Sequence, residues 1–137
     1  MAHRTTWLRS DFIAQENVNA FRSEDPAFIP RIRKSLQDDC SFVFDIKQAV
    51  RAGVDPFDMC DAMGKRLCHL HFNDNAIGKD CLLPGKGSMS FKLLRNKLED
   101  YGFCGDIIIE VYRKNFGKID ELQDAKKFTE NFVFGII

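Results

Sequence analysis

Four short apolar runs along the chain each lead into one acidic or imidazole side chain. Short runs rich in Phe, Ile, Leu and Val are typical of buried β-strands. The predicted strands span residues 12–16, 42–45, 67–72 and 107–111. The polar groups at or near their carboxyl ends are Glu16, Asp45, His71 and Glu110. A carboxylate is costly to bury unless it is paired or bound to a metal, so the repeated pattern suggests one shared site.

Helical periodicity fills most of the intervals between these strands. Asp25 before Pro26 predicts a first helix that settles only after Pro30, from about residue 32 to 37, and Ser90 predicts the cap of a later one. The other expected helices span residues 47–52, 56–63, 91 to about 102, and 119–132. Residues 73–87 have three glycines and little periodicity, which predicts a long loop.

The order of these elements predicts an α/β fold of four successive βα units with parallel strands and right-handed crossovers. Functional groups in such folds gather at the carboxyl ends of the strands, where all four polar groups lie. The two-residue period of a strand also places His69 on the same face as His71. Three carboxylates and one imidazole suit Mn²⁺, Mg²⁺, Co²⁺ or Zn²⁺, so we expect one divalent metal ion.

Composition narrows the class of protein. With 137 residues, 45% of them hydrophobic, the chain has the size and core of a single domain over residues 1–137. Twenty basic and twenty acidic residues cancel, which gives no electrostatic reason to bind nucleic acid or an anionic membrane. No apolar run approaches the length of a membrane span, and no signal-peptide core follows Met1. We therefore expect a cytoplasmic protein.

Five cysteines are placed irregularly. Cys40, Cys68 and Cys104 lie at or just before predicted strand starts, which favours buried free thiols in a reducing compartment. A zinc knuckle of Cys60, Cys68 and His71 is an alternative, although no paired C-x₂-C spacing supports it.

Five local motifs, in this order, resemble the xylose isomerase-like TIM barrels. The motifs are Ala-Gln-Glu-Asn at 14–17, Phe-Asp-Ile-Lys-Gln-Ala at 44–49, His-Leu-His-Phe-Asn-Asp at 69–74, Leu-Pro-Gly-Lys-Gly at 83–87 and Ile-Ile-Glu at 108–110. This family includes sugar-phosphate isomerases and epimerases, ketose 3-epimerases and abasic-site nucleases of the endonuclease IV type. The resemblance covers about residues 11–132 and corresponds to the second half of the family's barrel.

The resemblance implies roles for individual residues. Glu16, Asp45, His71 and Glu110 match the ligands of a mononuclear metal site in the isomerases and epimerases. Glu16 and Glu110 would also be catalytic, moving a proton off and onto substrate carbons through an enediolate. Among the substrate-binding or supporting residues, His69 would orient a neighbouring ligand and Gln48 would bind a sugar hydroxyl.

The glycine-rich segment contains further candidate residues. Exposed loop lysines are usually only solvated. The alternative for Lys79 and Lys86 is contact with a sugar phosphate, aided by backbone N–H groups near Gly85 and Gly87. Asn73 and Asp74 are expected to shape this loop instead of touching the substrate.

Three departures from the family pattern discriminate among its members. Gln48 and Cys81 stand where many members have His, and Lys86 replaces the Glu of the glycine loop. The abasic-site nucleases use such histidines to hold three zinc ions. An incomplete trinuclear site makes the nuclease reading the weaker one and favours a metal-dependent sugar isomerase or epimerase.

The length of the chain leaves a second class of function open. A complete (β/α)₈ barrel needs ~250 residues, so the first four units are missing from this sequence. Unpaired outer strands of a half-barrel invite association. We therefore expect a homo-oligomer, or a partner that supplies the N-terminal half-barrel. The alternative to an enzyme is a catalytically silent half-barrel that only folds and self-associates.

Overall fold

A computed structural model describes residues 14–37 and 39–137 of the chain. Its main sheet has four parallel strands in the order β1-β2-β3-β6. They are β1 (Ala14–Glu16), β2 (Ser41–Asp45), β3 (Leu67–Phe72) and β6 (Asp106–Ile109). The predicted α/β arrangement of four βα units with parallel strands is therefore confirmed. The expected start of the first strand, at residues 12 and 13, lies outside the described residues.

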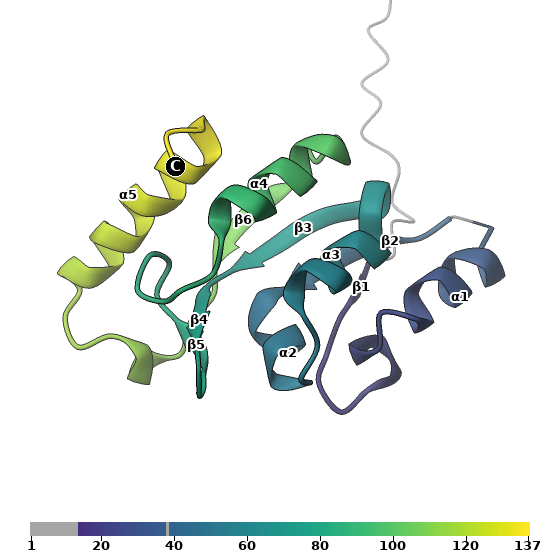
Figure 1. Ribbon diagram of the computed structural model, residues 1–137, viewed down its shortest axis with the longest axis horizontal. Helices are drawn as coiled ribbons and strands as arrows, with labels where there is room; N and C mark the ends of the chain where they lie inside the picture. The colour runs from purple at the N-terminus through teal and green to yellow at the C-terminus, as the bar shows by residue number, and fades with distance from the viewer. Residues whose placement is uncertain (1–13, 38) are drawn as a thin grey trace, which may run out of the picture.

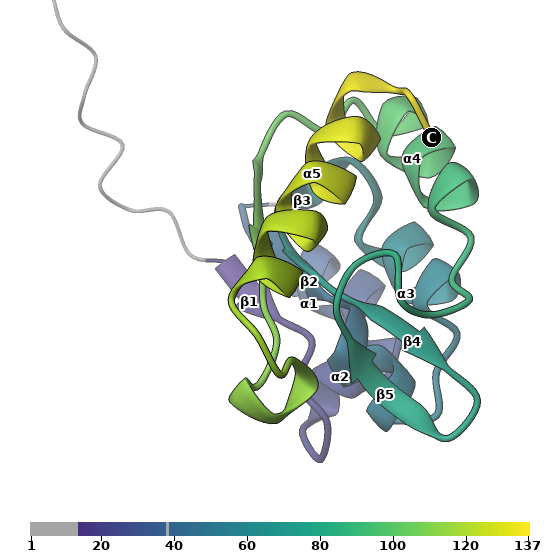
Figure 2. The same ribbon diagram turned by 90° about the vertical axis from the view of Figure 1, so that its left-hand side faces the viewer.

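Helices cover one face of this sheet, as Figures 1 and 2 show for α3 and α4. The helices are α1 (Phe28–Ser35), α2 (Ile46–Arg51), α3 (Pro56–Met63), α4 (Phe91–Asp100) and α5 (Asp120–Phe134), and the short 3₁₀ turns are Arg22–Glu24, Gly64–Arg66 and Arg113–Asn115. Asp55 accepts a hydrogen bond from the Phe57 N–H and Ser90 from the Leu93 N–H, so both act as N-caps. None of the helices in the described part of the chain is long and apolar enough to cross a membrane.

The core lies between the sheet and these helices. Phe42, Phe44, Leu70 and Phe72 alternate along β2 and β3 and are completely buried. The Phe72 ring packs against Phe91 of α4 and Phe132 of α5, with ring centroids 4.9 and 4.8 Å apart. The strands thus point every second side chain into the helix layer, as a half-buried sheet requires.

The opposite face of the sheet carries the other half of each strand's side chains. Parallel register places Val43 beside His69, Asp45 beside His71, and His71 beside Ile108. Ile108 is 50% exposed, and Val43, His69 and His71 are only partly buried. This inner face corresponds to the interior of a barrel, and within the described residues no helix covers it.

Two local predictions were wrong. Helix α1 begins at Phe28, not near Ile32, because Pro30 falls in the first turn, where a missing N–H removes no helical hydrogen bond. Asp25 caps the turn before it by accepting from the Ala27 N–H at 2.9 Å.

The expected long loop at 73–87 contains an antiparallel hairpin, β4 (Asp74–Ala76) and β5 (Lys79–Leu82), which lies beside α2. Gly78 turns it with a φ of +73°, a conformation that glycine adopts without strain.

Candidate metal centre

Four polar side chains converge at the carboxyl end of the sheet, on its inner face. Glu16, Asp45, His71 and Glu110 each offer one ligand atom, and these atoms lie within 4.8 Å of one another. The strands explain the convergence, because Glu16 ends β1, Asp45 ends β2, and the register sets Asp45 directly beside His71. Glu110 follows β6 and extends its pairing by one residue, donating its N–H to the Phe72 carbonyl at 3.1 Å.

His71 lies at the centre of this cluster. Its Nδ1 atom is 2.6 Å from Oε2 of Glu110, 3.2 Å from Oε1 of Glu16 and 3.6 Å from Oδ2 of Asp45. Although the first distance is short, the atoms are not aligned as a hydrogen bond. Both Nδ1 of His71 and Oε2 of Glu110 are buried without a hydrogen-bond partner among the described residues. Buried polar atoms are normally paired, so their lone pairs fit a cation held between them. The residues present therefore fit a divalent metal ion.

The three carboxylates of the cluster differ in solvent exposure. The Asp45 side chain is completely buried, whereas those of Glu16 and Glu110 are 33% and 43% exposed. Burial raises the pKa of Glu16, His71 lowers it, and the neighbouring Asp45 and Glu110 carboxylates raise it again, so the net effect is an increase. Glu16 and Glu110 are thus the two carboxylates of the cluster whose side chains solvent can reach.

Two asparagines fix the position of Asp45. The Asn17 side chain donates to the Asp45 carbonyl at 2.9 Å and accepts from the Asp45 N–H at 2.8 Å. The Asn73 amide reaches Oδ1 of Asp45 at 3.4 Å and the Glu110 carbonyl at 3.3 Å. Asn73 was expected to shape only the loop. Its position directly after the third strand was the one signal in the sequence that could have placed it here.

Lys47 is the residue of this site that the sequence did not reveal. It is 2% exposed, and its ammonium group bonds to Oδ2 of Asp45 and, at 2.9 Å, to Oε1 of Glu110. Burial lowers the pKa of Lys47, but hydrogen bonds to these two carboxylates outweigh it, so the pKa is raised. The sequence suggested only that Lys47 begins a short helix.

The remaining predicted residues lie around the cluster. The His69 ring meets the His71 ring edge to face, with centroids 5.2 Å apart, and is outside the group of four. Oε1 of Gln48 accepts from the Asn19 N–H at 3.1 Å, which holds the loop after β1. Lys79 and Lys86 are exposed, on the hairpin and the glycine loop.

Asp74 does shape the glycine loop, as expected. Its carboxylate accepts hydrogen bonds from the backbone of Asn75, Gly87 and Met89 at 2.8, 2.7 and 3.2 Å. A Cβ atom at Gly87 would collide with the Asp74 carboxylate and the Asn75 carbonyl, which explains a glycine there.

The zinc knuckle is not formed. Cys60 is buried in the core on the helix side of the sheet, and Cys68 donates its S–H to the Phe42 carbonyl at 3.3 Å. Burial raises the pKa of the Cys60 thiol to about 12, so this thiol is a poor ligand. All five cysteines are free. Cys40, Cys60 and Cys81 are buried, whereas Cys68 is only partly buried and Cys104 is exposed, so the expectation of buried thiols is met at three of the five positions.

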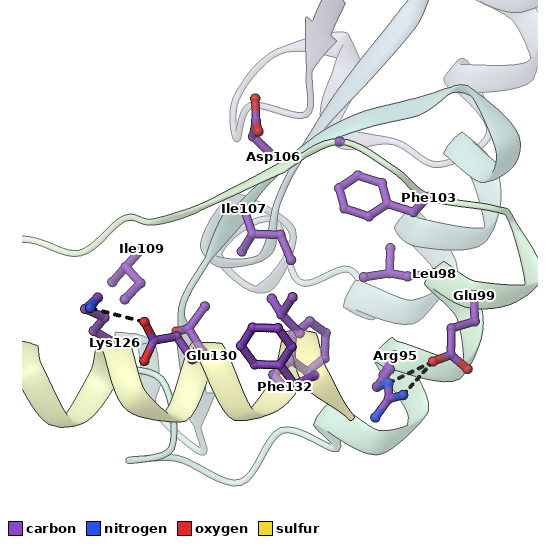
Figure 3. Close-up of a pocket in the computed structure, with 14 residues that line it drawn as sticks. Arg95, Leu98, Glu99, Phe103, Asp106, Ile107, Ile109, Lys126, Glu130 and Phe132 are labelled. Atoms are coloured by element: carbon purple, nitrogen blue, oxygen red, sulfur yellow. Dashed lines mark hydrogen bonds and ion pairs between the residues drawn. The ribbon is translucent and has the colours of Figure 1, made fainter. Parts of the chain in front are cut away.

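A groove of about 640 Å³ lies elsewhere, at the open edge of β6 beneath α4 and α5. Figure 3 shows Ile107, Ile109, Leu98, Phe103 and Phe132 lining it, with Arg95 and Glu99 paired at its rim. None of the four clustered residues contributes to this groove.

The chain is similar in sequence to a known protein family and to several proteins. The family described as xylose isomerase-like TIM barrel matches residues 12–132. Uncharacterized proteins of Mycobacterium bovis and Mycobacterium tuberculosis are 30% identical over 87 residues, which are 62% of this chain and 31% of theirs.

A solved structure of a D-tagatose 3-epimerase-like protein is similar in fold. Its TM-score is 0.63 at 24% identity, over 89% of this chain and 46% of that one. The chain therefore spans less than half the length of the proteins it matches.

Proposed function

The chain belongs to the xylose isomerase-like TIM barrel family, and on this premise we propose that it carries the metal centre of a sugar or sugar-phosphate isomerase or epimerase. The observation that supports this most is the convergence of Glu16, Asp45, His71 and Glu110, with Nδ1 of His71 and Oε2 of Glu110 buried and unpartnered. A set of one imidazole and three carboxylates suits Mn²⁺, Mg²⁺, Co²⁺ or Zn²⁺.

The four residues would have different roles, according to the solvent exposure of their side chains. Asp45 and His71 are the more buried pair and would serve only as ligands. Such an ion, when bound, supplies Lewis-acid polarisation of a carbonyl and stabilises negative charge that develops on the substrate.

Glu16 and Glu110 would carry the proton. They come from the two outer strands of the sheet and flank the centre, with their side chains accessible. One carboxylate removes the proton from the carbon next to the substrate carbonyl, which gives an enediolate. The other returns a proton to the neighbouring carbon, or to the opposite face of the same carbon.

Other residues would hold the sugar. The side-chain oxygen of Gln48 accepts a hydrogen bond from the Asn19 N–H, so the side-chain N–H₂ group would be available to a sugar hydroxyl. Lys79 and Lys86 are exposed on the hairpin and loop and would attract a phosphate group. His69, packed on the His71 ring, would hold that ring in orientation.

Titration of Mn²⁺ into metal-stripped protein tests the centre. We expect about one site per chain, lost in His71→Ala and retained in Asp61→Asn, which removes a carboxylate that lies outside the cluster. Turnover of ketoses and aldoses, followed by solvent-deuterium incorporation at the reacting carbon, should be lost in Glu110→Gln. The absence of saturable binding in the wild type contradicts the proposal.

We also propose that a second copy of the chain covers the open edge of the sheet. β6 has no partner strand on its outer side among the described residues. The apolar groove beside it lies where the next strand and helix of a barrel would pack. Two half-barrels would then pair β6 of each with β1 of the other. Sedimentation at micromolar concentration should show a dimer, and a folded monomer would contradict this arrangement.

A further inference from the structure

Lys47 places a positive charge inside the proposed metal centre. Its side chain is 3% exposed and its ammonium group contacts Asp45 and Glu110, two of the four clustered residues. An ammonium group is buried at this depth only where carboxylates compensate for the lost hydration. Lys47 is therefore part of the charge arrangement of the centre and not a surface lysine that happens to lie nearby.

The two oxygens of Asp45 are used differently. Oδ1 accepts the Lys47 backbone N–H at 3.0 Å and faces the Asn73 amide at 3.4 Å, so it caps α2. Oδ2 faces His71 Nδ1 at 3.6 Å and is the oxygen that the Lys47 ammonium contacts. The oxygen of Asp45 that points into the cluster is thus the one that Lys47 holds.

The two carboxylate oxygens of Glu110 also have different neighbours. Lys47 bonds to its Oε1 atom at 2.9 Å, and Oε2 lies 2.6 Å from His71 Nδ1. Lys47 therefore orients the Glu110 carboxylate so that one oxygen faces the imidazole. The same ammonium group competes with a metal ion for Asp45, because one carboxylate oxygen cannot bind an ammonium group and a metal ion equally well.

We propose that Lys47 is an internal competing cation, whose ammonium group must share or release Oδ2 of Asp45 when a divalent metal ion binds. Lys47 then weakens metal binding, keeps the ion exchangeable and holds the Asp45 and Glu110 carboxylates together in metal-stripped protein. Three carboxylates repel one another at these distances, and the lysine offsets part of that repulsion. The inference rests on the proposed metal centre.

The experiment measures Mn²⁺ affinity and thermal stability, with and without metal, for the wild type, Lys47→Met and Lys47→Gln. Both variants remove the charge, and the second keeps a hydrogen-bonding end if Lys47→Met does not fold. We expect the dissociation constant for Mn²⁺ to fall by about tenfold or more. The metal-stripped variants should melt lower than the wild type, and Mn²⁺ should raise their melting temperature by more than it raises that of the wild type.

Lys97→Met is the matched control. Lys97 also pairs with a carboxylate, Asp61, at 2.7 Å, but outside the cluster. This variant should lose an ion pair without any change in Mn²⁺ affinity.

Equal or weaker Mn²⁺ binding in both Lys47 variants, in protein that binds the metal, overturns the inference alone. Tighter Mn²⁺ binding in both Lys47 variants than in the wild type supports it. The absence of binding in every variant overturns the proposed metal centre and this inference with it.

Discussion

The two faces of the four-stranded sheet differ in what their side chains meet. Toward the helices, Phe42, Phe44, Leu70 and Phe72 are completely buried in a continuous apolar core. Toward the inside, β2 and β3 present Asp45 and His71, and β6 presents a half-exposed Ile108. The alternation of side chains along the strands therefore separates the residues that stabilise the fold from the residues that could do chemistry. The outer face can be complete in one half-barrel, whereas the inner face needs another surface opposite it.

The largest effect is expected on the covered face. Phe72→Ala should lower the free energy of unfolding by about 3–5 kcal/mol, because it removes a ring that packs between Phe91 and Phe132. Urea denaturation measures this loss. His69→Ala, on the inner face of the same strand, should cost much less, and equal costs would contradict the separation.

The next effect concerns charge on the inner face. Asp45→Asn should cost about 2–3 kcal/mol in metal-stripped protein, since Lys47 then keeps only the partly exposed Glu110 as a partner. The asparagine still offers an oxygen to the Lys47 N–H, so the cap of α2 is retained. Combining Asp45→Asn with Lys47→Met should recover part of the loss in a double-mutant cycle. Strict additivity would show that the pair contributes nothing.

A smaller effect should appear in association instead of folding. Ile108→Asp places a charge on the exposed inner face and should weaken dimerisation by about tenfold, or 1.4 kcal/mol. Stability of the monomer should change by less than about 0.5 kcal/mol. Ile77→Asp, at the fully exposed tip of the hairpin, is the control and should leave sedimentation unchanged.

The smallest effect lies in the helix layer and depends on pH. Burial raises the pKa of Asp61, but hydrogen bonds from Lys97 and Tyr101 lower it below its ordinary value overall. A carboxyl whose pKa is lowered by folding stabilises the protein above its unfolded pKa, and that contribution is lost as the pH falls through the folded pKa.

Between about pH 5 and pH 2, the wild type should therefore lose slightly more stability than Asp61→Asn. The difference should stay below about 1 kcal/mol because the Asp61 side chain is 41% exposed. Parallel pH profiles for the two proteins, measured by urea denaturation, would contradict this assignment.

The sequence predicts the strands and the convergence of four polar groups because both follow from short-range rules. Apolar runs identify the strands, and parallel strands bring their carboxyl ends to one edge. The hairpin was missed because Asp74, Asn75 and Lys79 lack the alternating β-branched pattern of a strand, and its pairing depends on Asp74 holding the next loop.

Lys47 was missed for a different reason. Lysine is rarely buried, so its sequence neighbours suggest a solvent-facing position at the start of a helix. Only the folded sheet shows that Glu110, far along the chain, comes within 2.9 Å of its ammonium group. The charge balance of the centre is thus a property of tertiary structure that local patterns do not encode.

The candidate ligands all come from one continuous segment between Glu16 and Glu110. In evolutionary terms, such a segment is a portable unit, because recombination that joins it to a different partner half carries the complete ligand set along.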